Sequence, residues 1–185
     1  MCTLLDWAGK FSFVLRLMSD STNPKVSLET SKGTITLELY QDKAPISVEN
    51  FLSYVEKNFF AETIFHRVIP NFMIQCGGVT EDMQQKNPDS PIKNEADNGV
   101  SNDCYTIAMA RTQVVDSATS QFFINTSNND FLNHGGRDFG YAVFGKVVEG
   151  TDIVDAIGAV PTGNKGGHQD VPVEAVLIQS ASLVS

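Results

Sequence analysis

The side chains most informative about chemistry lie in residues 65–78, whose sequence is FHRVIPNFMIQCGG. This segment places Arg67 and Gln75 among bulky apolar residues. A guanidinium offers five N–H donors in a planar fork and stays charged at every working pH. No histidine, carboxylate or thiol accompanies Arg67 in an acid/base pattern. The segment therefore predicts a surface that grips a peptide through hydrogen bonds and apolar contacts.

Patterns for metal binding and covalent catalysis are missing from the sequence. The three histidines are far apart and lack the HxxxH and HExxH spacings of metal sites. The three cysteines are odd in number and contain no CxxC pair, which predicts reduced thiols. We therefore expect no metal and no cofactor. The residues concerned are His66, His134 and His168, and Cys2, Cys76 and Cys104.

Composition limits the possible architectures and partners. The chain has 185 residues and 42% hydrophobic content, which is enough for one domain with a sizeable core. Its 13 basic and 22 acidic residues give a formal net charge of −9, which argues against nucleic acid as a partner. No stretch approaches the roughly 20 apolar residues that span a bilayer. The sequence therefore predicts one domain without a nucleic-acid or membrane partner.

The first 18 residues are fairly apolar but differ from a secretory signal, because Asp6, Lys10 and Arg16 interrupt the apolar run. We interpret residues 1–24 as a flexible appendage, partly upstream of a natural start at Met18, and residues 25–185 as the folded domain. A chain with reduced thiols and no secretory signal is expected in the cytoplasm.

Local periodicity predicts many short strands and only two helices. Residues 34–40 alternate apolar and polar side chains, as in a half-buried strand. One helix begins at Pro45, before apolar residues spaced at i, i+3, i+4 and i+7, and a second follows Gly150. Further strands are expected at residues 63–69, 72–76, 106–110, 121–125, 142–148 and 173–183. The prediction is a mainly β fold, a closed antiparallel β-barrel capped by two α-helices.

Strand periodicity also predicts which side chains share a face. Residues two apart on a strand point the same way, so Met73 lies beside Gln75, and Gln121 lies beside Phe123. The residues between them are expected to point into the core.

Seven sequence blocks occur in the order found in one known family. They are residues 65–78, PIKNE at 91–95, AMAR at 108–111, SQFFIN at 120–125, DFL at 130–132, YAVFG at 141–145 and HQDVP at 168–172. Together they span the chain from about Val26 to Leu183, and they resemble the cyclophilins, above all the bacterial cytoplasmic members. Cyclophilins are peptidyl-prolyl cis/trans isomerases. The resemblance implies an enzyme, free of any cofactor, that accelerates rotation about X–Pro bonds in unfolded or flexible protein segments.

The resemblance also implies roles for individual residues. Arg67 would be the catalytic arginine and Gln75 a polar partner in catalysis. Phe72 and Phe123 would complete the catalytic set and form a proline pocket with Met73 and Leu132. The residues expected to bind substrate are Met73, Ala110, Arg111, Gln121, Phe131, Leu132 and Tyr141, and none is expected to bind a metal.

Two positions depart from the eukaryotic members of the family. Phe131 and Tyr141 stand where those proteins carry a tryptophan and a histidine. Phe131 keeps an aromatic wall but lacks the indole N–H donor, which predicts weak binding of the inhibitor cyclosporin. The other expected partners are proline-containing peptides and unfolded proteins, which the chain would bind as a monomer.

Two alternative functions use the same fold. A proline-peptide binding or chaperone module would hold clients in the same groove without significant turnover, and an isomerase assay with and without Arg67 separates it from an enzyme. A small-ligand carrier would need a hollow barrel. Bulky inward positions argue against such a carrier, because they fill a small barrel. They include Ile35, Leu37, Phe122 and Val143.

Overall fold

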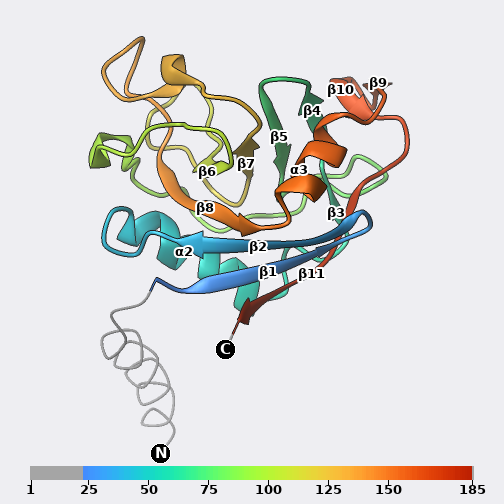
Figure 1. Cartoon of the computed structure of the whole chain (residues 1–185), viewed down its shortest axis with the longest axis horizontal. Coiled ribbons are helices and arrows are strands. Elements are labelled where there is room, and N and C mark those ends of the chain that lie inside the picture. The colour runs from blue at the N-terminus through green and yellow to red at the C-terminus, as the bar shows by residue number, and fades with distance from the viewer. Residues whose placement is uncertain (1–22, 185) are drawn as a thin grey trace, which may run out of the picture.

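The computed structural model describes residues 23–184, which are built around one antiparallel sheet of nine strands (Figure 1). The order across the sheet is β3-β11-β1-β2-β8-β6-β7-β5-β4. Their bounds, in chain order, are β1 Lys25–Thr30, β2 Gly33–Leu39, β3 Thr63–Ile64, β4 Arg67–Ile69, β5 Met73–Cys76, β6 Thr106–Met109, β7 Phe122–Asn125, β8 Val143–Glu149 and β11 Leu177–Val184.

The two edge strands of this sheet are neighbours in the sequence. Strand β3 pairs with β11, whereas β4 pairs with β5, and only Phe65 and His66 separate β3 from β4. The sheet therefore curls into a half-barrel, and the predicted single strand 63–69 is wrong because two strands occupy it. No ladder joins β3 to β4 within residues 23–184. The prediction of a mainly β, antiparallel, cyclophilin-like fold with two α-helices is confirmed.

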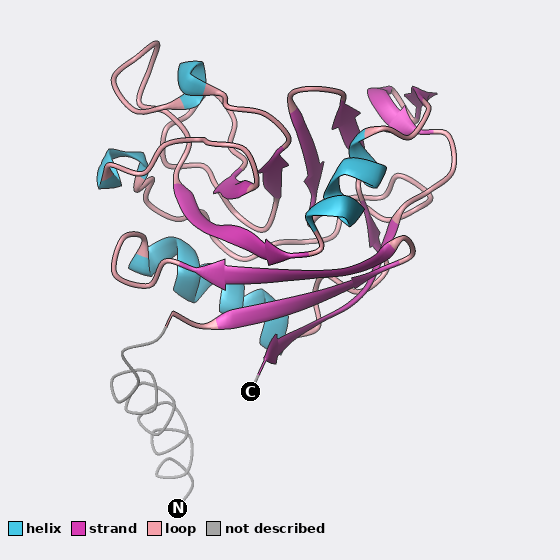
Figure 2. Ribbon diagram, viewed as in Figure 1, coloured by secondary structure: helices cyan, strands magenta, loops and turns pink. Residues whose placement is uncertain are grey.

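Both predicted helices are present (Figure 2). Helix α2, Pro45–Glu56, begins at its proline and packs against β8 and β11. Helix α3, Thr151–Gly158, follows Gly150, whose φ of 84° is in the left-handed region. A Cβ at Gly150 would lie 2.3 Å from the carbonyl oxygen of Thr34, so only glycine fits this connection between β8 and α3.

The two faces of the sheet bury different apolar clusters. The main core includes Ile74 and Phe122 together with the buried face of α2. The second cluster is smaller and contains Met73, Ala108, Phe123 and Val143, with partly buried aromatic residues around it. The predicted alternation is confirmed for Met73 and Phe123, which lie in the second cluster, on the opposite face from Ile74 and Phe122. The prediction that Val143 points inward is wrong, because Val143 belongs to the second cluster.

A hairpin that the sequence pattern did not predict covers one end of the sheet. Strands β9, Thr162–Lys165, and β10, His168–Pro172, pair with each other, and β10 lies against β4. Their turn is formed by Gly166 and Gly167, whose φ angles of 59° and 81° match a type I′ turn. Two 3-10 helices complete the structure, η1 at Ala96–Asn98 and η2 at Asp130–Leu132.

The structure bears unequally on the expectations for the N-terminus, the thiols and membrane-spanning segments. The predicted appendage, residues 1–24, falls almost entirely outside the described residues, as does Cys2. Cys76 is buried, Cys104 is half-buried, and both are free thiols. None of the helices in residues 23–184 is both long and apolar enough to cross a bilayer.

Candidate active site

One cleft brings together most of the residues that the sequence analysis selected. It has a volume of about 620 Å³ and opens on the face of the sheet that carries the second apolar cluster. Of the eleven predicted catalytic and binding residues, ten line it and Phe131 does not. The ten are Arg67, Phe72, Met73, Gln75, Ala110, Arg111, Gln121, Phe123, Leu132 and Tyr141.

A row of register partners runs across the sheet beneath this cleft. Arg67 on β4 lies opposite Gln75 on β5, and Gln75 lies opposite Phe123 on β7. Phe123 in turn lies opposite Ala108 on β6. Directly opposed residues have Cβ atoms about 4.5 to 5.5 Å apart and point to the same face. The antiparallel register therefore places the guanidinium, the amide and the aromatic ring in one line.

The two glutamines of the cleft are hydrogen-bonded to each other. Gln75 donates from Nε2 to Oε1 of Gln121 over 2.9 Å. The chain leaves room for this bond at Gly78, where a Cβ would lie 2.7 Å from Cγ of Gln121. Gly78 thus has a steric role, because any larger residue would displace the Gln121 side chain.

The guanidinium of Arg67 has no ion-pair partner among the described residues. Its residue is exposed, and no described carboxylate lies within ion-pairing distance of it. A charged donor without an ion-pair partner keeps its N–H groups available for a ligand in the cleft. Arg67 and Gln75 together can present several N–H donors above an apolar surface.

That apolar surface is firmly packed. Met73 is 2% exposed and Phe123 is 4% exposed, and Phe72, Leu132 and Tyr141 pack around them half-buried. The rings of Phe123 and Tyr141 meet edge to face, with centroids 5.7 Å apart at 76°. This arrangement is favourable for aromatic pairs and fixes the Phe123 ring. A small apolar ring such as that of proline would meet a preformed surface here.

A buried asparagine network holds Phe72 at the rim of the cleft. Asn129 donates from Nδ2 to the carbonyl oxygen of Phe72 over 2.9 Å and to Oδ1 of Asn125 over 2.7 Å. Asn125 in turn donates to the hydroxyl of Thr106 over 2.9 Å. The turn before Phe72 contains Asn71 with a φ of 58°, a conformation that asparagine tolerates. These supporting residues were not predicted, since nothing local in the sequence links them.

Arg111 differs sharply from Arg67, because its side chain is only 4% exposed. Its Nε donates to the carbonyl oxygen of Gly140 over 3.0 Å, and its Nη2 lies 3.1 Å from Oδ2 of Asp138. The guanidinium carbon also lies 4.6 Å from the ring centroid of Tyr141. Arg111 thus fastens the loop of residues 133–140 to the edge of the cleft. The backbone N–H of Gly140 and, to a smaller extent, the contact with Arg111 lower the pKa of Asp138.

Phe131 lies beside the cleft and not in it. Its ring stacks on that of Phe72, with centroids 5.6 Å apart and an angle of 28°, and 53% of the residue is exposed. It lines a second, adjoining pocket that shares Leu132 and Tyr141 with the cleft.

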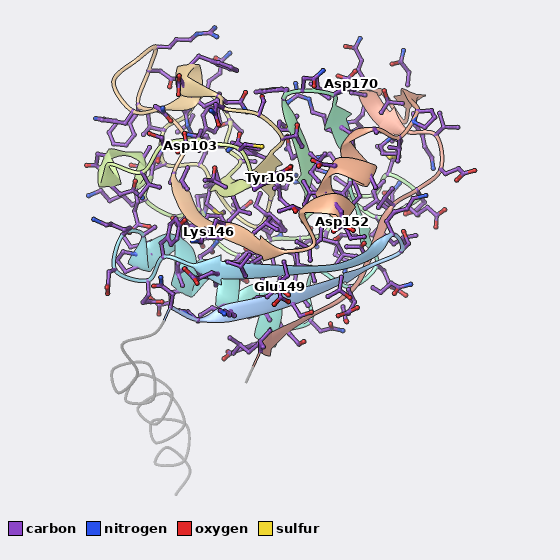
Figure 3. All side chains as sticks on the ribbon, viewed as in Figure 1. Asp103, Tyr105, Lys146, Glu149, Asp152 and Asp170 are labelled. Atoms are coloured by element: carbon purple, nitrogen blue, oxygen red, sulfur yellow. The ribbon has the colours of Figure 1, made fainter. Side chains whose placement is uncertain are left out.

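Two of the three histidines are far apart in the sequence but neighbours in the fold. Strand β10 brings His168 next to His66, with ring centroids 6.4 Å apart, and both line the cleft together with Asp170, which is labelled in Figure 3. Burial, and next the charge of His168, lower the pKa of His66 to about 4, so that its imidazole is neutral at neutral pH. Within residues 23–184, no group of three or more potential ligands could hold a metal ion.

Comparison with known proteins identifies the family. The profile described as "Cyclophilin type peptidyl-prolyl cis-trans isomerase/CLD" matches residues 25–183. Peptidyl-prolyl cis-trans isomerase A of Dickeya dadantii is 56% identical over 164 residues, which cover 89% of this chain and 86% of the relative. Peptidyl-prolyl cis-trans isomerase B of Escherichia coli is 52% identical over 161 residues, with 85% and 98% covered.

A solved structure has the same fold. The crystal structure of a cyclophilin-type isomerase from Cryptosporidium parvum covers 88% of this chain and 98% of its own, with a TM-score of 0.76 and 24% identity. At this identity the likeness concerns the fold alone. From the matched profile and the bacterial relatives, this chain belongs to the cyclophilin-type peptidyl-prolyl cis-trans isomerases, and its activity is peptidyl-prolyl cis-trans isomerisation.

Proposed function

We propose that the chain isomerises X–Pro bonds in flexible or unfolded protein segments, with Arg67 stabilising the twisted amide while the neighbouring apolar surface holds the proline ring. One observation carries this mechanism: Arg67 and Gln75 are opposed in register, directly beside the packed surface of Met73 and Phe123. The roles assigned to individual residues rest on this geometry and on the family resemblance.

The reaction breaks no bond. Rotation about an X–Pro amide has a barrier of roughly 18 to 20 kcal/mol, because resonance is lost at the half-turned geometry. A turnover of about 10 to 1,000 per second requires lowering the upper value by roughly 4 to 7 kcal/mol. The catalyst must therefore bind the twisted amide more tightly than either planar form.

Arg67 supplies a hydrogen-bond donor that can bind the twisted amide more tightly than the planar forms. When resonance is lost, the prolyl nitrogen becomes pyramidal and gains a lone pair that accepts a hydrogen bond, whereas the planar amide nitrogen does not. A guanidinium N–H aimed at this nitrogen therefore favours the transition state. One charge-assisted hydrogen bond contributes about 1.5 to 3 kcal/mol, which is too little alone.

Positioning supplies the rest. The ring of proline rests on Phe72, Met73, Phe123 and Leu132, while Gln75 and the backbone near Ala110 hold the flanking peptide. Fixing one side of the bond while the other turns reduces the entropy lost on reaching the transition state. Preorganised donors in a partly dehydrated cleft also act more strongly than in water.

The test is to compare the wild type with Arg67→Ala by NMR exchange spectroscopy on a proline tetrapeptide. We expect the isomerisation rate constant to fall by about 10²- to 10³-fold, or roughly 3 to 4 kcal/mol, with little change in thermal stability because Arg67 is exposed. Wild-type rates in the folded variant would refute the mechanism. Peptide binding without any accelerated exchange in the wild type would instead indicate a binding or chaperone module.

We also propose that residues 25–185 form the functional unit, that it acts as a cytoplasmic monomer, and that cyclosporin binds it weakly. The matched profile begins at residue 25, which supports treating residues 1–24 as an appendage. A chain that lacks residues 1–18 should keep full activity and the same thermal midpoint as the 185-residue chain. A loss of either would mean that the removed residues stabilise the domain.

A further inference from the structure

A second pocket adjoins the cleft and has a volume of about 390 Å³. It shares Arg111, Leu132 and Tyr141 with the cleft, so a peptide bound in one can extend into the other. An extended chain advances about 3.3 Å per residue, and a residue within a few positions of the proline can therefore reach this pocket.

The charges around the second pocket do not cancel. Three charged residues line it, Arg111, Arg137 and Asp138. Arg111 and Asp138 neutralise each other through their contact of 3.1 Å. Arg137 is exposed, and no described carboxylate lies within ion-pairing distance of it. The pocket therefore carries one excess positive charge in a chain whose formal net charge is −9.

Hydrogen bonds, an ion pair and an aromatic contact hold the walls of this pocket in place. Arg111 fastens residues 133–140 to the rest of the molecule through Gly140 and Asp138. Phe131 also lines the pocket, stacks on Phe72 and is 53% exposed, so it offers an apolar face. A ligand side chain would thus meet an apolar wall for its methylene groups and a guanidinium for its end.

We propose that this second pocket is a subsite for an acidic side chain of the substrate, aspartate or glutamate, located near the isomerised proline, with Arg137 as the specificity-determining residue. The proposal rests on the proposed function, because it assumes that the peptide occupies the cleft. A carboxylate fits better than an amide since it adds a charge-assisted hydrogen bond to Arg137. The protein as a whole is negatively charged. The attraction between Arg137 and a substrate carboxylate therefore acts only within about 10 Å of Arg137, at an ionic strength of about 0.1 M.

The experiment measures kcat/KM by NMR exchange for a set of peptides that share one Ala–Pro bond. Glutamate is placed in turn at each of the three positions before and after the Ala–Pro pair, and each peptide is matched by one with glutamine there. We expect one position at which glutamate raises kcat/KM by about 2- to 5-fold over glutamine, the range of an exposed ion pair. Arg137→Gln should abolish this ratio, and Arg137→Glu should invert it. Salt at about 1 M should reduce it in the wild type.

Lys32→Gln serves as the matched control. Lys32 is exposed in the β1–β2 turn and lines neither pocket, yet its replacement changes the net charge as Arg137→Gln does. The glutamate preference should survive in this variant. Two results would overturn the subsite. One is loss of the glutamate preference in Lys32→Gln as well as in Arg137→Gln. The other is a ratio of kcat/KM for glutamate over glutamine peptides that Arg137→Gln leaves unchanged at every position. Turnover of the glutamine peptides by the wild type tests the isomerase separately, so failure of one proposal does not imply failure of the other.

Discussion

Arg67 and Gln75 are opposed in register on β4 and β5, and Gln75 is tied in turn to Gln121 by a hydrogen bond of 2.9 Å. The amide of Gln75 is thus fixed, whereas the guanidinium beside it is unpaired. A substrate carbonyl or prolyl nitrogen arriving between them would meet one oriented donor and one adaptable donor. Substitutions can therefore test separately whether catalysis needs the planar guanidinium of Arg67 and the observed position of the Gln121 side chain.

Arg67→Lys separates the charge of the side chain from its geometry. An ammonium keeps the positive charge but lacks the planar fork with which a guanidinium can hold two acceptors. We expect kcat/KM to fall by about 10-fold or more, closer to Arg67→Ala than to the wild type. The measurement is exchange spectroscopy on a proline tetrapeptide, with thermal unfolding to verify the fold. Full activity in Arg67→Lys would mean that only charge matters at this position.

Gly78→Ala should disturb the Gln75–Gln121 bond without touching either glutamine. The new methyl group would lie 2.7 Å from Cγ of Gln121, so that side chain must move away. Loss of one neutral hydrogen bond at the cleft should lower kcat/KM by about 2- to 10-fold. Gly163→Ala is the control, since its methyl group would have no neighbour closer than 4.0 Å. Equal activity of both variants would indicate that Gln121 does not assist catalysis.

Much of the cleft could be predicted because its residues follow strand periodicity. Met73 and Gln75 alternate with Ile74 along β5, so the local pattern alone assigns them to one face. By contrast, Phe131 was expected to line the groove but lies in the adjoining pocket. Its position depends on η2 and on the loop after it, and neither segment has a periodic pattern of apolar residues from which a side chain could be placed.

The features that could not be predicted depend on contacts between distant segments. Residues 63–69 read as one strand, yet β3 and β4 pair with different partners at opposite edges of the sheet. Periodicity reports which way a side chain points but not which strand lies next to it. For the same reason the neighbouring positions of His66 and His168 become evident only once the β9–β10 hairpin is placed beside β4.

His66 should make the protein less stable in acid. Its pKa is lowered to about 4 in the folded state from an ordinary value of 6.5, so between these values the unfolded chain binds more protons. The free energy of unfolding therefore falls as the pH falls from 6.5 to about 4, by about 3 kcal/mol from this residue. Urea unfolding across this pH range should reveal a flatter profile for His66→Gln than for the wild type.

His134→Gln is the control for this substitution, since it also replaces a histidine by glutamine but at an exposed position. Identical slopes for His66→Gln and the wild type would contradict the lowered pKa. Isomerisation itself should vary little between about pH 6 and 8, because His66 is already neutral there and a guanidinium does not titrate.

Phe131→Trp tests the departure from the eukaryotic pattern. The substitution adds an indole N–H donor and apolar area beside Leu132, next to the cleft. A neutral hydrogen bond contributes about 0.5 to 1.5 kcal/mol and the added aromatic contact a similar amount. Affinity for cyclosporin should rise by about tenfold, measured by calorimetric titration, while turnover of a short peptide changes much less. Unchanged affinity in the folded variant would mean that the inhibitor does not reach position 131.

Strand β1 lies between β2 and β11 and pairs with β11 along its whole length, from Lys25 opposite Val184 to Thr30 opposite Ile178. The first and last strands of the described chain are therefore direct neighbours. During synthesis, β1 and β2 leave the ribosome long before β11, so one edge of β1 stays without a partner until translation has passed residue 184. Contacts between such distant segments also slow folding. The sheet is thus complete only once β11 has been synthesised, and until then β1 carries an open strand edge of the kind that promotes aggregation.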